Sequence, residues 1–362
     1  MKTAAIITIH VGFNFGSVLQ TIATSEIIAE VGYKPIIVNY IPDRATDSRY
    51  FKDVKYSLPR LIKRILYYPI YLWNKNNVYG GYLGKYVNLS KPIYSKDKFV
   101  EVCPEAEVYV TGSDQVWNSI HNEGFDGHYF FDGIPQKKKK IAFSASIGRE
   151  ELDSEELQNI KSHLNRYSAV SVREASAVKI LNEIDIHAEH LLDPTLLLNK
   201  SQWDRFESPR KIREPYLVIY TPYNIVDEAL IYRTARNIAK QYGLKIVTFS
   251  TTFKGNLHAD KTIKYATPGD FLSLINHADF VITNSFHGTA FAINLNKQFL
   301  VYPPSAFSTR IKSILSLTGL TDRLVKEEIT PQQLTEIKYE AVNKILDEER
   351  HKSKMFLKKA LS

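Results

Sequence analysis

A polar turn over residues 284–288 holds the residue types best suited to chemistry in this chain. It separates a buried-strand pattern from a helix expected over residues 289–296. Ser285 and His287 place a hydroxyl and an imidazole in the turn, and Gly288 lets a ligand approach the backbone closely. Since a helix start after a strand offers backbone N–H groups and a positive dipole, the turn predicts an anion-binding active site. The plainer alternative is a helix capped by Ser285, with a structural His287.

Three further turns place polar side chains where a strand is expected to end. Their notable members, in chain order, are Asn14, Ser17 and Gln20, then Asp114, Gln115 and Trp117, then Arg173. The first turn lacks the G-x-G-x-x-G spacing of a dinucleotide site. Each turn alone also has a structural explanation, since Ser17 and Asp114 can cap helices and Trp117 can belong to the core.

Strand and helix patterns that could position these turns alternate through both halves of the chain. Strands are expected over residues 5–9, 35–40, 108–111, 141–146, 169–172, 216–220, 245–250, 280–283 and 298–302. Helices are expected over residues 16–31, 154–167, 174–181, 226–242, 268–276, 289–296, 310–317 and 331–361. This alternation predicts an α/β fold with two Rossmann-like domains facing a cleft, followed by C-terminal helices. The expected domains are residues 1–205, residues 206–330 and a helical segment of residues 331–362.

Composition places the chain among soluble globular enzymes. Its 362 residues suggest two domains, with 44% apolar and 24% charged residues. The single Cys103 excludes a disulfide framework and a cysteine metal site, and the ten histidines show no zinc-like spacing, so no metal is expected. The first apolar run is too short for a signal peptide, and no run reaches the roughly 18 apolar residues of a spanning helix. We therefore expect a cytoplasmic protein.

Residues 44–98 form a basic, aromatic insertion in the first domain. They hold twelve Lys and Arg residues against three Asp, a net charge of +9, and nine of the 22 tyrosines. A helix after Ser57 would place on one face Leu58, Leu61, Ile62, Ile65 and Leu66, and on the opposite face Arg60, Lys63 and Arg64. Such a helix, with Trp73 near its end, is typical of a surface that lies on anionic lipid. The alternative is a helix packed on its own domain with a solvated basic face. No nucleic-acid motif accompanies the charge, so we expect no nucleic-acid partner.

Taken together and in order, the turns resemble the polysaccharide pyruvyl transferase family. The motifs that carry the resemblance are Asn14-x-Gly16-x-x-Leu-Gln20, Gly112-Ser-Asp-Gln-Val-Trp117, Ala145-Ser-Ile-Gly148, Ser171-Val-Arg-Glu174, Leu192-Asp-Pro-Thr-Leu-Leu197, Ser285-Phe-His-Gly288 and Arg310-Ile. The second and the sixth are the most specific. The resemblance spans almost the whole chain but does not cover the basic insertion.

The resemblance implies a fold like that of the GT-B glycosyltransferases and a transfer from phosphoenolpyruvate to two hydroxyls of a sugar. The product would be a cyclic pyruvate ketal in a surface or capsular polysaccharide, with phosphate released. The expected donor-binding residues are Arg173, Ser285, His287, Gly288 and Arg310. The expected catalytic residues are His287, as acid or phosphate partner, and Asp114, as base for the sugar hydroxyl. Acceptor-binding residues would be Asn14, Ser17, Gln20, Gln115 and Trp117. The scheme needs no cofactor besides the donor substrate and no metal.

Two other functions remain open at this stage. The first is a nucleotide-sugar glycosyltransferase of the same shape, with a carboxylate such as Asp270 or Asp279 holding the ribose. The second is a non-catalytic protein that docks on glycan intermediates through residues 44–98. If the transferase interpretation holds, the acceptor could be linked to a polyprenyl diphosphate. The basic insertion would then hold the enzyme on the inner face of the cytoplasmic membrane.

Overall fold

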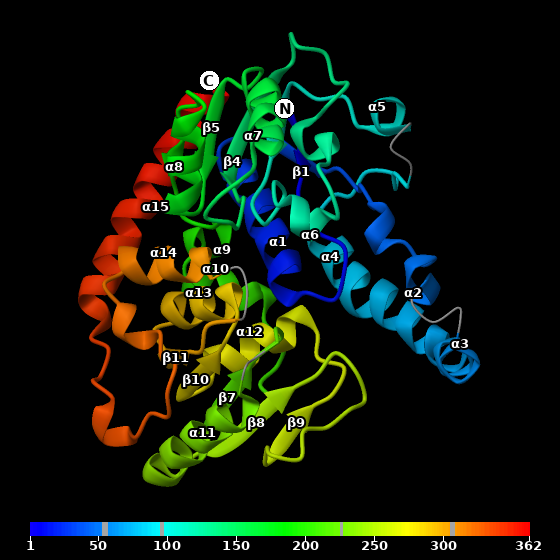
Figure 1. The fold of residues 1–362 in the computed structure, drawn as a ribbon. Helices are drawn as coiled ribbons and strands as arrows, with labels where there is room; N and C mark the ends of the chain where they lie inside the picture. Colours follow the sequence, from blue (N-terminus) through cyan, green and yellow to red (C-terminus); the bar gives the residue numbers. More distant parts are fainter. Residues whose placement is uncertain (53–56, 95–97, 225–226, 305–307) are drawn as a thin grey trace. The chain divides into compact units, whose positions relative to one another are not determined.

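The computed structural model of the chain describes residues 1–52, 57–94, 98–224, 227–304 and 308–362. It divides into two compact units (Figure 1). The first comprises Met1–Pro194 with Lys354–Ser362, and the second comprises Thr195–Ser353. The domain boundaries expected after residues 205 and 330 stay predictions.

A six-stranded parallel sheet forms the first unit. Its strands are β1 (Thr3–Ile7), β2 (Lys34–Ile37), β3 (Val108–Thr111), β4 (Lys139–Ala145), β5 (Ala169–Val172) and β6 (Glu189–His190), in the order β2-β1-β3-β4-β5-β6. The central strands β3 and β4 are buried almost throughout because both faces of such a sheet are covered. The chain turns back across the sheet between β1 and β3, which creates a switch point where α/β folds bind ligands.

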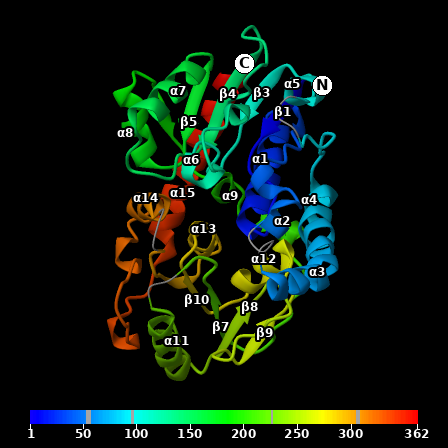
Figure 2. The same ribbon diagram turned by 45° about the vertical axis from the view of Figure 1, so that its right-hand side comes forward.

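Helices cover both faces of this first sheet. They are α1 (Phe15–Glu30) on one face, and α7 (Ser154–Leu164) and α8 (Ala175–Glu183) on the other (Figure 2). This division follows from right-handed crossovers that run in opposite directions from the switch point. The helix α1 begins where it does because the side chain of Asn14 accepts hydrogen bonds from the N–H groups of Gly16 and Ser17, at 2.9 and 3.2 Å.

The second unit contains a five-stranded parallel sheet. Its strands are β7 (Tyr216–Tyr220), β8 (Lys245–Phe249), β9 (Lys261–Ile263), β10 (Phe280–Thr283) and β11 (Gln298–Val301), in the order β11-β10-β7-β8-β9. The longer helices are α11 (Glu228–Tyr242), α12 (Pro268–Asn276), α13 (Phe286–Asn294) and α14 (Thr309–Leu317). The switch point of this sheet lies between β7 and β10, so residues that follow β10 stand at a favoured ligand position.

Shorter elements complete the chain. In the basic insertion they are η1 (Asp43–Ala45), α2 (Arg49–Lys52), α3 (Leu58–Trp73), the π-helical η2 (Asn74–Gly80) and α4 (Gly81–Tyr86). Elsewhere they are α5 (Phe99–Val102), α6 (Ser119–Asn122), η4 (Gly127–Phe130), α9 (Pro194–Leu197), α10 (Lys200–Trp203), η5 (Asp204–Phe206), η6 (Thr321–Arg323) and η7 (Pro331–Gln333). The last helix is α15 (Tyr339–Leu361). No helix of the described residues is long and apolar enough to cross a membrane.

The observed architecture confirms the α/β class, the parallel sheets and the C-terminal helices. The long helix expected from residue 331 is wrong in its start, because α15 begins only at Tyr339. The preceding stretch is instead fixed to the start of β11, since Gln298 donates to the carbonyl of Ile337 and accepts from its N–H, at 3.2 and 2.9 Å. The expected start of the helix over residues 226–242 lies outside the described residues.

Candidate active site

A buried polar cluster surrounds Arg173 at the carboxyl ends of the first sheet. Arg173 directly follows β5, and its side chain is fully buried. One terminal nitrogen, Nη1, donates to Asp193 at 2.7 Å and to the hydroxyl of Ser113 at 3.3 Å. The other, Nη2, donates to Asp114 at 3.1 Å. The guanidinium therefore joins the segments that follow β3, β5 and β6.

Asp114 connects this cluster to the switch point of the first sheet. Its Oδ2 accepts the hydroxyl proton of Ser17 at 2.6 Å, which links the loop after β3 to the start of α1. Its Oδ1 accepts the backbone N–H of Gln115 at 2.9 Å. Asp114 has a φ of 76°, a left-handed conformation that few residues other than glycine adopt. Such backbone strain persists where surrounding contacts fix it, and it gathers at functional sites.

Glu174 is the third carboxylate near Arg173. Its Oε2 lies 3.9 Å from Nε of Arg173. Its Oε1 accepts from the hydroxyl of Ser146 at 3.1 Å and from the N–H groups of Ile147 and Gly148, each at 2.8 Å. Glu174 thereby fixes the turn after β4 to the same cluster.

The charge of Arg173 is secured by these three neighbours. Burial acts to lower the pKa of its guanidinium, but Asp193, Asp114 and Glu174 together raise that pKa above its usual value. A buried charge of this kind is stable only while its partners remain. Arg173 thus has a positioning role in this structure, and its direct contact with a donor stays a prediction.

The residues expected to bind the acceptor are held inside the first unit. Asn14 caps α1, and Gln20 is fully buried with its Nε2 donating to Thr8 and to the carbonyl of Ile9. The indole of Trp117 is 4% exposed and stacks on Phe130, with ring centroids 5.2 Å apart. Ser17 and Gln115 are also buried, the first bonded to Asp114 and the second accepting from Asn118 at 2.8 Å. These contacts stabilise the turns after β1 and β3. The prediction that the five side chains contact the acceptor stays a prediction.

The turn after β10 forms the corresponding site in the second unit. Ser285 is the N-cap of α13, and its hydroxyl accepts the N–H of Gly288 at 3.4 Å. The helix begins at Phe286, three residues earlier than expected, so His287 and Gly288 lie in its first turn. His287 is 3% exposed. The structure therefore confirms that Ser285 caps the helix, and an anion-binding role of the turn stays a prediction.

Gly288 has a packing reason to be glycine, besides the predicted approach of a ligand to its backbone. A Cβ atom there would lie 2.3 Å from Oγ1 of Thr283 and 3.1 Å from Cδ1 of Tyr220. Thr283 is itself fixed, because it donates to the carbonyl of Tyr220 at 2.7 Å and accepts the N–H of Ser285 at 3.1 Å. The absent side chain lets α13 pack closely on β10 and β7 at the switch point.

Arg310 lies beside this turn, as the family motifs imply. It is buried in the first turn of α14, with its Cζ 5.6 Å from the ring centroid of Phe286. The rings of Phe286 and His287 are in turn 5.2 Å apart, edge to face. Phe286, in the first turn of α13, thus contacts both the guanidinium of Arg310 and the imidazole of His287. Lys297 follows the far end of α13, and burial lowers its pKa to about 8.

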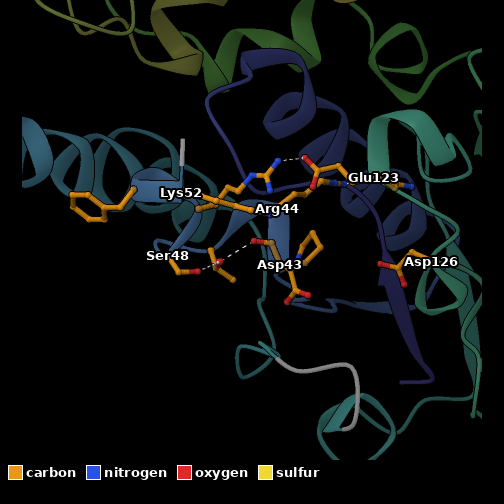
Figure 3. Close-up of a pocket in the computed structure, with 11 residues that line it drawn as sticks. Asp43, Arg44, Ser48, Lys52, Glu123 and Asp126 are labelled. Carbon is orange, nitrogen blue, oxygen red and sulfur yellow. Dashed lines mark hydrogen bonds and ion pairs between the residues drawn. The ribbon is translucent and has the colours of Figure 1, made fainter. Parts of the chain in front are cut away.

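A cavity of about 670 Å³ lies in the first unit, outside the residues singled out from the sequence (Figure 3). Residues 42–52 form one wall and residues 122–126 the other. Arg44 donates to Asn122 at 2.7 Å, and Arg49 pairs with Glu123 at 2.6 Å. Hydroxyls, carboxylates, cations and the ring of Phe51 all reach it. The sequence did not predict this cavity, because its two walls are about 75 residues apart in the chain. What the sequence did indicate was the basic composition of the wall formed by residues 42–52.

Metal binding finds no support in the part of the chain that the structure describes. Within it, no group of three or more His, Cys, Asp or Glu side chains is arranged to hold an ion.

Comparison with known proteins adds a family and a fold. A sequence model described as polysaccharide pyruvyl transferase matches residues 14–305. No curated protein matches the chain. Similar solved structures include the UDP-GlcNAc 2-epimerase of Neisseria meningitidis bound to UDP-GlcNAc, at 11% identity over 98% of this chain and 94% of that chain, with a TM-score of 0.53. MnaA of S. aureus with UDP is 12% identical over 98% of this chain and 91% of that chain, with a TM-score of 0.53. The epimerase of Methanocaldococcus jannaschii with UDP-GlcNAc and UDP is 13% identical over 97% of this chain and 94% of that chain, with a TM-score of 0.50. These likenesses show the fold alone, and they confirm the expected GT-B type.

Replacing Arg173 by Met should lower the free energy of unfolding by about 3–5 kcal/mol, because it leaves three buried carboxylates without their cation. Urea unfolding of the variant and of Arg213→Met would measure this. The control removes an exposed arginine and should shift stability by no more than about 0.5 kcal/mol. Equal stability of the two variants would contradict the positioning role.

Replacing Gly288 by Ala should lower the free energy of unfolding by about 1–3 kcal/mol, because the new methyl group overlaps Thr283 in a packed interior. Gly84→Ala is the matched control, since Gly84 lies within α4 and a Cβ there meets nothing within 4 Å. That variant should gain up to about 1 kcal/mol from helix propensity. Thermal or urea unfolding would show the expected loss of stability in Gly288→Ala and the expected gain in Gly84→Ala. A stabilised Gly288→Ala protein would refute the packing argument.

Proposed function

Because the chain belongs to the polysaccharide pyruvyl transferase family, we propose that it transfers the enolpyruvyl group of phosphoenolpyruvate to two hydroxyls of a sugar. The product is a pyruvate ketal, formed during the synthesis of a surface or capsular polysaccharide, and phosphate is released. The observation that carries this proposal is the capped start of α13 at the switch point of the second sheet, with His287 in its first turn.

The second-unit turn suits a substrate with two anionic groups. Phosphoenolpyruvate carries a phosphate and a carboxylate, and each needs N–H or cationic donors. The first turn of α13 offers the partial positive charge of a helix N-terminus. Arg310 supplies a guanidinium, whose flat fork matches a carboxylate or a phosphate. We propose that this turn binds the donor.

His287 is the proposed acid of the reaction. The methylene carbon of phosphoenolpyruvate gains a proton, and the resulting electrophilic C2 accepts the oxygen of one sugar hydroxyl. The bond between C2 and the phosphate oxygen then breaks, and the oxygen of the second hydroxyl closes the ketal. The two hydroxyl protons balance the proton taken up by carbon and the proton carried by the departing phosphate. An imidazole can supply the first proton or neutralise the leaving phosphate near neutral pH.

Asp114 has a less direct part in this scheme than the sequence suggested. Both its oxygens already accept hydrogen bonds, from Ser17, Gln115 and Arg173. A carboxylate held in this way orients its neighbours more readily than it takes a proton from a substrate. We propose that it holds the loop after β3 in place, which makes it a positioning residue rather than the base.

For the sugar acceptor, we propose the cavity of Figure 3. It adjoins the family motif after β3, because the side chain of Asn122 donates to the carbonyl of Val116 at 2.9 Å. Its hydroxyls, carboxylates and cations can bind sugar hydroxyls, and Phe51 offers an apolar surface. The acceptor would then be recognised by the side chains that line the cavity, and the buried motif residues would hold those side chains in position.

The nucleotide-sugar alternative finds less support in the second unit. Its candidate ribose ligands have structural partners: Asp270 completes the capping box of α12 and pairs with Lys211 at 2.7 Å. Asp279 accepts the N–H of Tyr216 at 3.0 Å before β10 begins, at the opposite edge of the sheet from His287. Neither carboxylate is placed to hold a ribose at the switch point.

Replacing His287 by Ala should abolish phosphate release from phosphoenolpyruvate, by at least about a hundredfold, because the reaction loses its acid. The measurement is phosphate release with a sugar acceptor present, alongside the thermal midpoint of the folded protein. His351→Ala is the control, since that histidine is exposed on α15, and it should retain full activity. A fully active His287→Ala enzyme would exclude the assignment.

Replacing Lys52 and Asp43 by Ala should raise the KM for the acceptor by about tenfold while leaving stabilisation by phosphoenolpyruvate unchanged, because both side chains line the cavity of Figure 3. Initial rates at varied acceptor concentration, with donor-induced melting shifts, separate the two effects. Lys240→Ala, on an exposed face of α11, is the control. An unchanged acceptor KM would place the acceptor elsewhere.

A further inference from the structure

The helix α3 presents its apolar side to solvent. None of its residues is buried. Its exposed apolar side chains, with their exposed fractions, are Leu58 at 70%, Ile62 at 50%, Ile65 at 55%, Leu66 at 70%, Ile70 at 37% and Trp73 at 51%. Their spacing of three and four places them on one side of the helix, along its whole length. In Figures 1 and 2, α3 lies at the edge of the first unit, away from its sheet.

The opposite side of α3 packs on its own unit through aromatic and basic side chains. The ring of Tyr71 lies 4.2 Å from that of Tyr50 and 5.3 Å from that of Phe13. The guanidinium of Arg64 lies 4.5 Å from the ring centroid of Tyr50. The alternative in which the apolar side packs on the domain and leaves a basic face in water is therefore wrong. The apolar side faces outward, which a folded chain tolerates only where something covers it.

The sequence around the exposed row is basic. The sequence has no Asp or Glu from residue 54 to residue 96, whereas the same stretch holds eight Lys and Arg residues. On α3 itself, the basic face opposite the apolar row is partly exposed, at Arg60 and Lys63. An apolar row flanked by cations matches the boundary between acyl chains and anionic headgroups.

We propose that α3 docks on the surface of an anionic lipid bilayer. The apolar row enters the acyl boundary, Arg60 and Lys63 contact lipid phosphates, and Trp73 lies at the headgroup level. The helix lies on the membrane and does not span it. Because Phe51 of α2 lines the cavity of Figure 3 and its ring lies 5.0 Å from that of Tyr68 on α3, docking would bring the cavity near lipid-linked sugars.

A second copy of the chain fits this surface less well than a bilayer does. A helix of 16 residues is about 24 Å long and about 10 Å wide, so its face offers roughly 240 Å². A stable protein interface needs about 800 Å² from each partner. Two copies meeting through α3 would also bring like charges together with no acidic residue to offset them. Docking on lipid needs no such area, because apolar insertion and headgroup attraction act on each side chain separately.

The test is binding of the full chain to vesicles of phosphatidylcholine, with and without phosphatidylglycerol. We expect binding to the anionic vesicles only, weakened by salt. Ile62→Asp with Leu66→Asp should abolish it, and Arg60→Gln with Lys63→Gln should weaken it about 25-fold, about fivefold for each charge removed. Leu257→Asp with Lys254→Gln is the matched control, since both residues are exposed in the second unit, and it should bind like the natural chain.

Tryptophan fluorescence reports where on the chain the contact forms. Trp117 and Trp203 are buried at 4% and 2% exposure, so a blue shift on adding anionic vesicles should come from Trp73 and vanish in Trp73→Phe. No vesicle binding, or equal binding by the Ile62→Asp, Leu66→Asp protein, would overturn the proposal. So would a dimer that this variant dissociates, because α3 would then cover a second copy. The readouts do not involve pyruvyl transfer, so the result stands apart from the proposed function.

Discussion

The first unit depends on one buried guanidinium surrounded by three carboxylates. Arg173 binds Asp193 and Asp114 and lies next to Glu174, and each carboxylate fixes a different segment at the carboxyl edge of the sheet. Hydrogen bonds to Ser17 and to the turn after β4 extend this network to the start of α1 and to Gly148. Desolvation of so many polar groups is costly unless all are paired, so the loops can occupy only one arrangement. The family motifs of the first unit are thus largely the parts of one network.

The second unit obtains its site by close packing rather than by charge. The helix α13 approaches β10 closely because Gly288 leaves room for Thr283, and Ser285 caps the first turn. His287 lies in the first turn of this helix, and the guanidinium of Arg310 lies against the ring of Phe286 beside it. The partial positive charge of a helix N-terminus suits an anionic substrate, whereas the guanidinium of Arg173 is paired with its own carboxylates.

The sequence predicted those features that depend on local pattern. Strands β3, β5, β7 and β10 have the expected bounds because each is a short, largely apolar segment. The burial of Arg173 could not be predicted from the sequence, because it depends on partners such as Asp114, 59 residues away in the chain. The exposure of the apolar face of α3 could not be predicted either. The periodicity of the sequence defines an apolar and a basic face of the helix, but it does not say which of them packs on the domain. Arg310 was assigned to the donor site only through the family resemblance, because its own spacing carries no such signal.

Acceptor-dependent phosphate release from phosphoenolpyruvate tests the central claim most directly. The assay would use free and lipid-linked galactosides, glucosides and mannosides as acceptors, with mass analysis of each product and thermal shifts with each donor. The account predicts that one acceptor class stimulates phosphate release and gains one pyruvate ketal, and that phosphoenolpyruvate raises the melting temperature. Stabilisation by a nucleotide sugar, with phosphoenolpyruvate neither bound nor consumed, would contradict it.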